Sequence, residues 1–556
     1  MTTAANTAET SQRPGFSLPA ASSAAWLYAL IGVMAAMHVS MVFGRSVNWD
    51  EFWFYSQVEV VARGEFIQPL QTIHTRFFAW WLPNMPGNEI DHIIIARMFM
   101  FACLAITATG IFLTAQKFSD RRVALIATAA YLGAGFVLQH GTAFRVDPIV
   151  AALLTSGFAV AALTRLRLMS IIALGALIGL AGMVTIKFVL WAPAFAGIAL
   201  YCWEEEGFDW RYPLRWIAAG LVALGVFALL YTLHASGFEE QAREAAAGTL
   251  GRSSSGMLGI ASSPHLGAAA KALFTALPLA IAIVIAPWVI AKDTMTWQRK
   301  LALAAMWLPV LTPLFYRNSL PYFYPFILPP VVVVTVWAFR MIVQRYSGAL
   351  IAAVIAGSAL MIWAVDARGV TDRQQVLVNA VHQTFDKPVN YFDCCGMIAT
   401  FPKQNTFRTG FGVERYLAAG EPTLLQTMRE TPVPFLLDNN REFSKAILGT
   451  DNSTFHPDDA DALANTYVRF WGDIFLAGKE VAAGTSETWD VLVPGPYTVS
   501  GTLIIDGREW SDGSIVTLDR GSHVLENAKG DDAGLIWGEG LVRPTATAPD
   551  AYWTAF

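Results

Sequence analysis

Two adjacent carboxylates, Asp50 and Glu51, begin the stretch DEFWFY (50–55), which follows an apolar run long enough to cross a membrane. As helix caps they would be useful only if a helix began at Phe52. An ionised side chain within a membrane costs about 3 kcal/mol unless it is paired or hydrated, so acids at this position are candidates for function. A carboxylate here could accept a proton from a hydroxyl group.

Other ionisable side chains border apolar segments on the same predicted side of the membrane. Two or three acids and three or four cations around one outward-facing site suit a reaction in which a hydroxyl attacks and a phosphate leaves. The cations would stabilise the phosphate, and an acid would take the proton. The whole set consists of Asp50, Glu51, His74, Arg76, His140, Arg145, Asp147, Lys187 and Arg317.

Each of these residues also has a structural reading. Asp147 precedes a proline and could simply begin a helix. Single arginines and lysines at helix ends commonly extend to the lipid headgroups. His74 and His140 could be hydrogen-bonding groups at the membrane interface, and Tyr322 and Tyr324 fit an aromatic belt there.

The composition indicates that the bilayer is the solvent for most of the chain. Of the 556 residues, 54% are hydrophobic and only 15% are charged, whereas charged residues make up roughly 25% of a soluble protein. The net charge of -5, without a cluster of Lys and Arg, argues against nucleic acid as a partner. Cys394 and Cys395 are adjacent, so they cannot link distant strands.

About eleven apolar stretches are long enough to be membrane-spanning helices. Alternate connections between them, such as KFSDRR (117–122), RLR (165–167) and KDTMTWQRK (292–300), are rich in Lys and Arg and should face the cytoplasm. The first long loop, 44–91, then lies outside. Because the number of spans is odd, the region after the last span also lies outside. The stretches run near 23–43, 92–115, 122–140, 148–164, 170–186, 188–202, 214–233, 271–291, 300–316, 320–339 and 348–365.

After Asp366 the composition becomes that of a soluble region. Residues 497–525 alternate apolar and polar side chains between glycine-containing turns, which predicts short antiparallel strands and a small β-sandwich. Residues 370–480 mix helical and strand patterns. The predicted fold is therefore mainly α: a polytopic membrane protein with a cytoplasmic tail (1–22), a membrane domain (23–365) and an external α/β region (366–556) that is β-rich from about 485.

Five sequence elements, in order, resemble those of the GT-C glycosyltransferases, in particular the branch of protein O-mannosyltransferases and lipid A aminoarabinose transferases. The resemblance covers about residues 20–345. The elements are DEFWFY (50–55), HTRFFAWWLP (74–83), FRVDPIVAALL (144–154), GLAGMVTIKFVLWAPAF (179–195) and RNSLPYFYPFILPPVVV (317–333).

The resemblance implies a transferase that uses a polyprenyl-phosphate sugar and acts with inversion. It implies Asp50 as the catalytic base, supported by Glu51. Arg76, with His74, would contact the donor phosphate, although the family's Lys-Pro-Pro or His-Pro-Pro motif is absent here. Lys187 matches the lysine of a Thr-Lys-Gly element, but Ile186 and Phe188 interrupt that match.

The remaining predicted ligands lie in the same elements, except His140, which lies in the connection 140–147 on the same outer side. Arg317 would be a further phosphate ligand, and the substrate-binding set would be Tyr55, His140, Arg145, Asp147, Tyr322 and Tyr324. Asp50 and Asp147 are hard oxygen ligands that could hold Mg or Ca.

The acceptor is open among a glycolipid, a polysaccharide and a protein, and the expected location is a bacterial inner membrane with the active site facing the periplasm. Two alternatives remain. A transporter or flippase of a charged lipid should show polar groups through the membrane midplane and two related halves. A non-catalytic glycan-binding membrane protein would use the acids for structure only.

Overall fold

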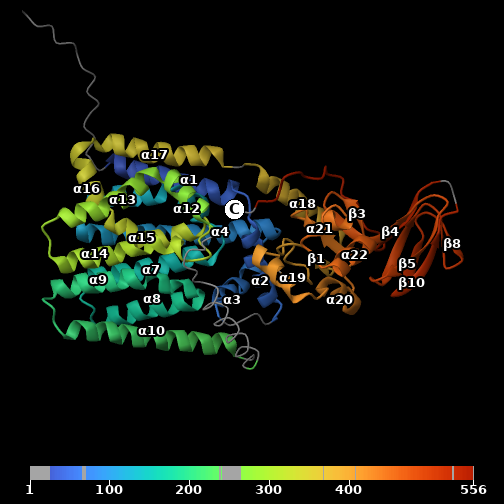
Figure 1. Ribbon diagram of the computed structural model, residues 1–556, viewed down its shortest axis with the longest axis horizontal. Coiled ribbons are helices and arrows are strands. Elements are labelled where there is room, and N and C mark those ends of the chain that lie inside the picture. Colours follow the sequence, from blue (N-terminus) through green and yellow to red (C-terminus); the bar gives the residue numbers. More distant parts are fainter. Residues whose placement is uncertain are drawn as a thin grey trace, which may run out of the picture.

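A bundle of long helices is joined at one end to a mixed α/β region (Figure 1). The computed structural model describes residues 25–65, 70–236, 240, 265–366, 368–406, 408–528 and 531–554. In Figure 1 the C-terminal elements, from α18 onward, lie beyond the end of the bundle where α2 and α3 are found. The predicted cytoplasmic tail lies outside the described residues.

Every apolar stretch predicted from the sequence is helical. In chain order the helices are α1 (Ala25–Gly44), α4 (Glu89–Phe118), α5 (Arg121–Leu132) with α6 (Gly135–His140), α7 (Val146–Leu163), α8 (Leu168–Val184), η2 (Ile186–Trp191) with α9 (Ala192–Glu205), α10 (Arg211–Ala235), α12 (Leu266–Thr275) with α13 (Leu277–Lys292), α14 (Trp297–Trp307) with η3 (Leu308–Leu314), α15 (Phe323–Val334) with α16 (Val336–Arg345), and α17 (Gly348–Val365).

The number of spans differs from the number of apolar stretches. Among the described residues, six helices are long and apolar enough to cross a membrane, or up to eight if each of two bent pairs is one span. The bends are 101° between α12 and α13 and 61° between α15 and α16. The apolar stretch that begins with α14 continues as the 3₁₀ helix η3, which contains Pro309 and Pro313. The chain is a multi-pass membrane protein, and the predicted count of eleven is not confirmed.

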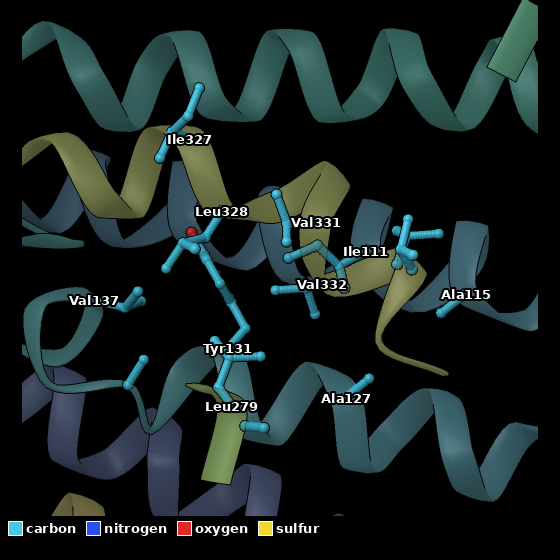
Figure 2. Close-up of a cluster of buried hydrophobic side chains, with 14 of the residues drawn as sticks. Ile111, Ala115, Ala127, Tyr131, Val137, Leu279, Ile327, Leu328, Val331 and Val332 are labelled. Atoms are coloured by element: carbon cyan, nitrogen blue, oxygen red, sulfur yellow. The ribbon is translucent and has the colours of Figure 1, made fainter. Parts of the chain in front are cut away.

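Helix α15 lies at the centre of the bundle. All of its residues are buried, as expected for a helix that is apolar on every side. Figure 2 shows Ile327, Val331 and Val332 of α15 among side chains of α4, α5 and α13. The Tyr131 hydroxyl on α5 donates to the Pro325 carbonyl at 2.8 Å. This packing fixes the start of α15, which follows Tyr322.

The first loop forms two short helices, α2 (Trp49–Ala62) and α3 (Ile73–Ala79), and a 3₁₀ turn, η1 (Leu82–Asn84). Asn48 is the N-cap of α2, and its side chain accepts from the backbone N–H groups of Asp50 and Glu51. The Glu51 carboxylate in turn accepts from the Asn48 N–H, which completes a capping box. The helix therefore begins before Phe52 and carries both acids in its first turn.

The described residues of the C-terminal region form five helices and two sheets. The helices are α18 (Val370–Thr384), α19 (Gly410–Ala419), α20 (Thr423–Glu430), α21 (Glu442–Ile447) and α22 (Pro457–Thr466). One sheet has the order β1-β2-β4-β11-β6-β9, with β3 also paired to β4; the other has the order β5-β10-β7-β8. β1 and β2 are parallel, and the remaining pairs are antiparallel.

The strands confirm a C-terminal sheet region, as the alternating pattern predicted. Side chains from both sheets, such as Trp489 and Leu535, meet in one hydrophobic cluster. The sandwich arrangement and the domain limits stay predictions. The strands are β1 (Tyr391–Phe392), β2 (Phe435–Leu437), β3 (Tyr467–Trp471), β4 (Ile474–Val481), β5 (Ser486–Val491), β6 (Gly495–Ser500), β7 (Leu503–Ile505), β8 (Arg508–Trp510), β9 (Ile515–Leu518), β10 (Gly521–Glu526) and β11 (Ala533–Trp537).

The C-terminal region packs directly on the first loop. A single hydrophobic cluster combines side chains of α2 and α4 with side chains of α18, β1 and β2. Gln374 of α18 bonds both the N–H and the carbonyl of Val47, one residue before the cap of α2. The turn at Cys394 and Cys395, whose thiols are free, leads to Gly396, which packs against Ser56 of α2. The C-terminal region thus helps to fix α2 in place.

Candidate functional site

Four charged side chains from three helix starts form a chain of ion pairs. Asp50 comes from the first turn of α2, Arg145 is the N-cap of α7, Asp147 lies in the first turn of α7, and Lys187 lies in η2. Arg145 binds Asp50 through Nη1 and Asp147 through Nε, the latter at 3.3 Å. Lys187 binds the other oxygen of Asp147. The four residues span 137 positions in the sequence, from Asp50 to Lys187. Their side chains nevertheless meet in one place, as predicted.

The four groups differ in exposure. The side chains of Arg145, Asp147 and Lys187 are 5%, 2% and 10% exposed, and that of Asp50 is 15% exposed. Buried charges persist only where they are paired, because an unpaired partner is left without solvation. Asp50 is at the more accessible end of this row of ion pairs, so it is the acid that an incoming group could reach.

Tyr322 and Phe54 supply aromatic surface to these cations. The Arg145 guanidinium lies 3.4 Å from the centre of the Tyr322 ring and 5.4 Å from that of Phe54. Lys187 Nζ is 5.5 Å from the Tyr322 ring centre. A ring face attracts a cation, and the attraction is stronger where water is excluded. Tyr322 is thus part of the ion-pair site and not only of an interfacial belt.

Glu51 faces away from the row of ion pairs and is completely buried. Its carboxylate accepts from Arg97 Nε at 2.7 Å and Arg97 Nη2 at 2.5 Å, and from the Phe144 N–H at 2.7 Å. Burial alone would raise the pKa of Glu51, but the Arg97 guanidinium and these hydrogen bonds outweigh burial and lower the pKa. The residue ties α2 to α4 and to the segment before α7, which positions Asp50 against Arg145.

The other predicted phosphate ligands have different surroundings from the residues of the ion pairs. Arg76 is exposed, and its Nη2 donates to the His234 carbonyl at 3.1 Å. His74 is buried with its ring centre 5.6 Å from that of Phe54, so it lies one aromatic ring from Arg145. Arg317 is exposed in the connection between η3 and α15.

The other predicted substrate ligands also have different surroundings from one another. The Tyr55 hydroxyl lies 2.5 Å from both Glu59 Oε1 and His92 Nδ1, on the side of α2 that faces α4. His140 is buried at the end of α6, and Tyr324 packs against Phe136 at a ring distance of 5.3 Å. The structure therefore brings together Asp50, Arg145, Asp147, Lys187 and Tyr322 from the predicted set.

The acids do not fit a resident divalent cation in this arrangement. Asp50 and Asp147 both bind Arg145, and Asp147 also binds Lys187. A metal ion between the two carboxylates would stand in the place of the guanidinium. In the described parts of the chain no group of three or more His, Cys, Asp or Glu side chains could hold a metal ion.

Arg97 is the residue that sequence reasoning missed. It occurs within HIIIARMFMF (92–101), in an apolar stretch already taken as a span. A charge inside such a stretch is itself a signal of function or of a buried partner. Its guanidinium also donates to the carbonyls of Arg45 and Ser46 at 2.8 Å, directly before the cap of α2.

No protein-family model and no curated protein matches this chain. Solved structures do. The chain superposes on ArnT from Cupriavidus metallidurans, whose structure is bound to undecaprenyl phosphate, with a TM-score of 0.57 and 12% identity over 82% of this chain and 98% of ArnT. This chain therefore shares its overall fold with ArnT. The resemblance predicted from five sequence elements is therefore confirmed for the fold.

A second structure supports the same conclusion. The oligosaccharyltransferase of Archaeoglobus fulgidus, tethered to an acceptor peptide, superposes with a TM-score of 0.51 and 9% identity over 94% of this chain and 98% of that protein. Both superpositions extend over more than four-fifths of this chain, so they reach beyond the membrane helices.

Proposed function

We propose that this chain is a glycosyltransferase that moves a sugar from a polyprenyl-phosphate donor to an acceptor hydroxyl. The observation that carries the proposal is the ion-pair chain, in which the partly exposed Asp50 lies beside two cations, Arg145 and Lys187, at one end of the bundle. An acid to take a proton and cations to hold a phosphate are what this transfer needs. The undecaprenyl phosphate in the ArnT structure supports a donor of this kind.

The proposed reaction is a single displacement with inversion. The acceptor oxygen forms a bond to the anomeric carbon while the bond from that carbon to the phosphate oxygen breaks. The acceptor proton goes to the Asp50 carboxylate, and the bonding electrons leave with the polyprenyl phosphate. The donor phosphate carries one negative charge and the leaving phosphate gains a second, so Arg145 and Lys187 would stabilise the transition state more than the ground state.

The proposed location is a bacterial inner membrane, with the site and the C-terminal region facing the periplasm. The Lys- and Arg-rich connections at the opposite side of the predicted spans support this orientation. A donor anchored in the membrane would not require a soluble activated sugar in that compartment. The acceptor is a glycolipid, a polysaccharide or a protein, and the transfer needs no divalent cation.

The test uses purified protein in lipid nanodiscs with undecaprenyl phosphate carrying arabinose, aminoarabinose, glucose, galactose, mannose or an N-acetylhexosamine. Release of undecaprenyl phosphate from at least one donor supports the proposal. Asp50→Asn should lower the rate by about 100-fold or more, because it removes the proton acceptor. Asp458→Asn is the matched control, since Asp458 also lies in the first turn of a helix but is exposed on α22.

Three outcomes would contradict the proposal. One is wild-type turnover in correctly inserted Asp50→Asn protein. Another is donor lipid that moves between leaflets with its sugar still attached, which would indicate a flippase. The third is binding of free glycan without release of undecaprenyl phosphate from any donor, which would indicate a non-catalytic receptor.

A further inference from the structure

Among the residues that the structure describes, two buried imidazoles near the row of ion pairs have ring nitrogens without a hydrogen-bond partner. His74 and His234 are each 6% exposed. Neither ring nitrogen of His74, and not Nδ1 of His234, has a hydrogen-bond partner among the residues that the structure describes. His234 Nε2 lies 2.9 Å from the Thr72 hydroxyl. An unsatisfied buried polar group costs about 1–3 kcal/mol, so these nitrogens indicate a missing partner.

The place of His74 connects it to the proposed chemistry. Its ring meets the Phe54 ring edge-on with centres 5.6 Å apart, and the centre of Phe54 is 5.4 Å from the Arg145 guanidinium. Arg145 in turn binds Asp50. One phenyl ring therefore separates the imidazole from the cation proposed to hold the donor phosphate.

The segment that carries His74 is also tied to the element that carries Lys187. The Thr185 hydroxyl donates to Gln71 Oε1 at 3.3 Å and accepts from the Lys187 N–H at 3.4 Å. Gln71 has φ = 64°, in the left-handed region that a residue with a side chain seldom adopts. Such a conformation costs about 1 kcal/mol or more and persists where surrounding contacts impose it, often at ligand sites. These contacts fix the position of the segment that carries His74 relative to Lys187, one of the cations proposed to bind the phosphate.

The chemistry of His74 suits a hydroxyl group better than a phosphate, to which a neutral ring offers one donor and no charge. Burial, with a smaller contribution from the nearby His234, lowers the pKa of His74 to about 3, so the ring is neutral at physiological pH. A neutral imidazole offers one N–H donor and one acceptor nitrogen. A hydroxyl group also offers one donor and acceptor lone pairs, whereas a phosphate only accepts. The vacant positions on the two rings therefore match the hydroxyls of a sugar.

We propose that His74, with His234 beside it, hydrogen-bonds hydroxyl groups of the donor sugar and so determines which sugar is transferred. This inference rests on the proposed function and reassigns His74 from the phosphate, where the sequence placed it, to the sugar. Because a site built to hydrogen-bond a substrate hydroxyl strongly rejects an analogue that lacks it, the two imidazoles would act on specificity.

The experiment measures binding of undecaprenyl phosphate, and of undecaprenyl phosphate carrying each sugar of the panel, to protein in nanodiscs. Wild-type protein should bind at least one sugar-bearing lipid more tightly than the bare lipid. His74→Leu should weaken binding of that lipid by about 10-fold or more, the effect of a lost hydrogen bond to a buried group, and leave undecaprenyl phosphate unchanged. His74→Asn retains a donor and an acceptor and should keep part of the preference. His234→Leu should reduce the preference in the same direction.

Thermal unfolding of the ligand-free protein gives a second readout. If the imidazole nitrogens of His74 have no partner, His74→Leu should unfold at the same or a higher temperature than wild-type protein. The matched control is His38→Leu. His38 is also a buried histidine but bonds the Leu132 carbonyl at 3.0 Å, so its loss should lower the unfolding temperature and leave sugar preference intact.

The outcomes separate the two proposals. Failure of wild-type protein to bind undecaprenyl phosphate would overturn the proposed function and this inference with it. Three results would overturn the inference alone: equal affinity for the bare lipid and all sugar-bearing lipids, equal weakening of both by His74→Leu, or a marked loss of stability in ligand-free His74→Leu.

Discussion

Replacing Glu51 with glutamine tests whether the two adjacent acids have different roles. The Glu51 carboxylate accepts five hydrogen bonds, two from Asn48, two from Arg97 and one from the Phe144 N–H. A glutamine has the same shape, but its NH₂ group would face donors and its neutral amide would leave the Arg97 guanidinium buried without a counter-charge. Breaking a buried ion pair from one side costs about 3–5 kcal/mol.

The expected result is a large loss of stability. A change of 1 kcal/mol shifts the unfolding temperature by about 2 °C in large domains, so Glu51→Gln should unfold about 6–10 °C below wild-type protein. Asp50→Asn should change it much less, because Asp50 is more exposed and Arg145 keeps Asp147 as a partner. Unfolding of purified protein in one detergent, followed by intrinsic fluorescence, would measure both.

A double-mutant cycle with Arg97→Gln provides the control. The destabilisation of the double variant should be smaller than the sum of the single variants by about 2–3 kcal/mol, because the second change removes the charge that the first left unpaired. Wild-type stability in Glu51→Gln together with abolished turnover would refute the structural role. Glu51 would then have to act in the chemistry itself.

Three further predictions concern charge. Lys187→Met should lower the turnover rate by about 100- to 1000-fold, the usual effect of removing one transition-state charge contact, in a steady-state assay of donor use. Turnover in excess EDTA should equal that without it, because cations already neutralise the two site acids. The Asp506 carboxylate, 2.7 Å from His523, outweighs burial and raises the pKa of His523 above its ordinary 6.5. The stabilisation is complete below that value and lost as pH rises through the raised pKa, so Asp506→Asn should reduce this pH dependence of unfolding.

The positions of the helices, and the clustering of four of the predicted side chains, were predictable because both follow from local patterns. Apolar run lengths fixed where the helices lie, and Asp50, Arg145, Asp147 and Lys187 all occur where an apolar segment begins or ends on one predicted side. The number of spans was not predictable from these lengths, since one apolar stretch ends in the 3₁₀ helix η3 and bends interrupt two others.

The division of labour between the two acids shows what the sequence could not give. Adjacent residues suggest a shared role, yet successive side chains on a helix point about 100° apart. Asp50 consequently faces Arg145, and Glu51 faces Arg97, a residue 46 positions away. Likewise the nitrogens of His74, which have no partner in the described part of the chain, become meaningful only once the burial of the ring is known.

The pairing in the site has a consequence for the order of events in the proposed mechanism. Arg145 is the partner of Asp50 in the protein without substrate, and it is also one of the two cations proposed for the phosphate. A donor phosphate that takes over Arg145 would release the Asp50 carboxylate, while Asp147 still holds the guanidinium through Nε. The base would become free to accept the acceptor's proton only when the donor is in place. Donor binding would therefore precede deprotonation, and an acceptor, or water, arriving first would meet a carboxylate already engaged with its guanidinium.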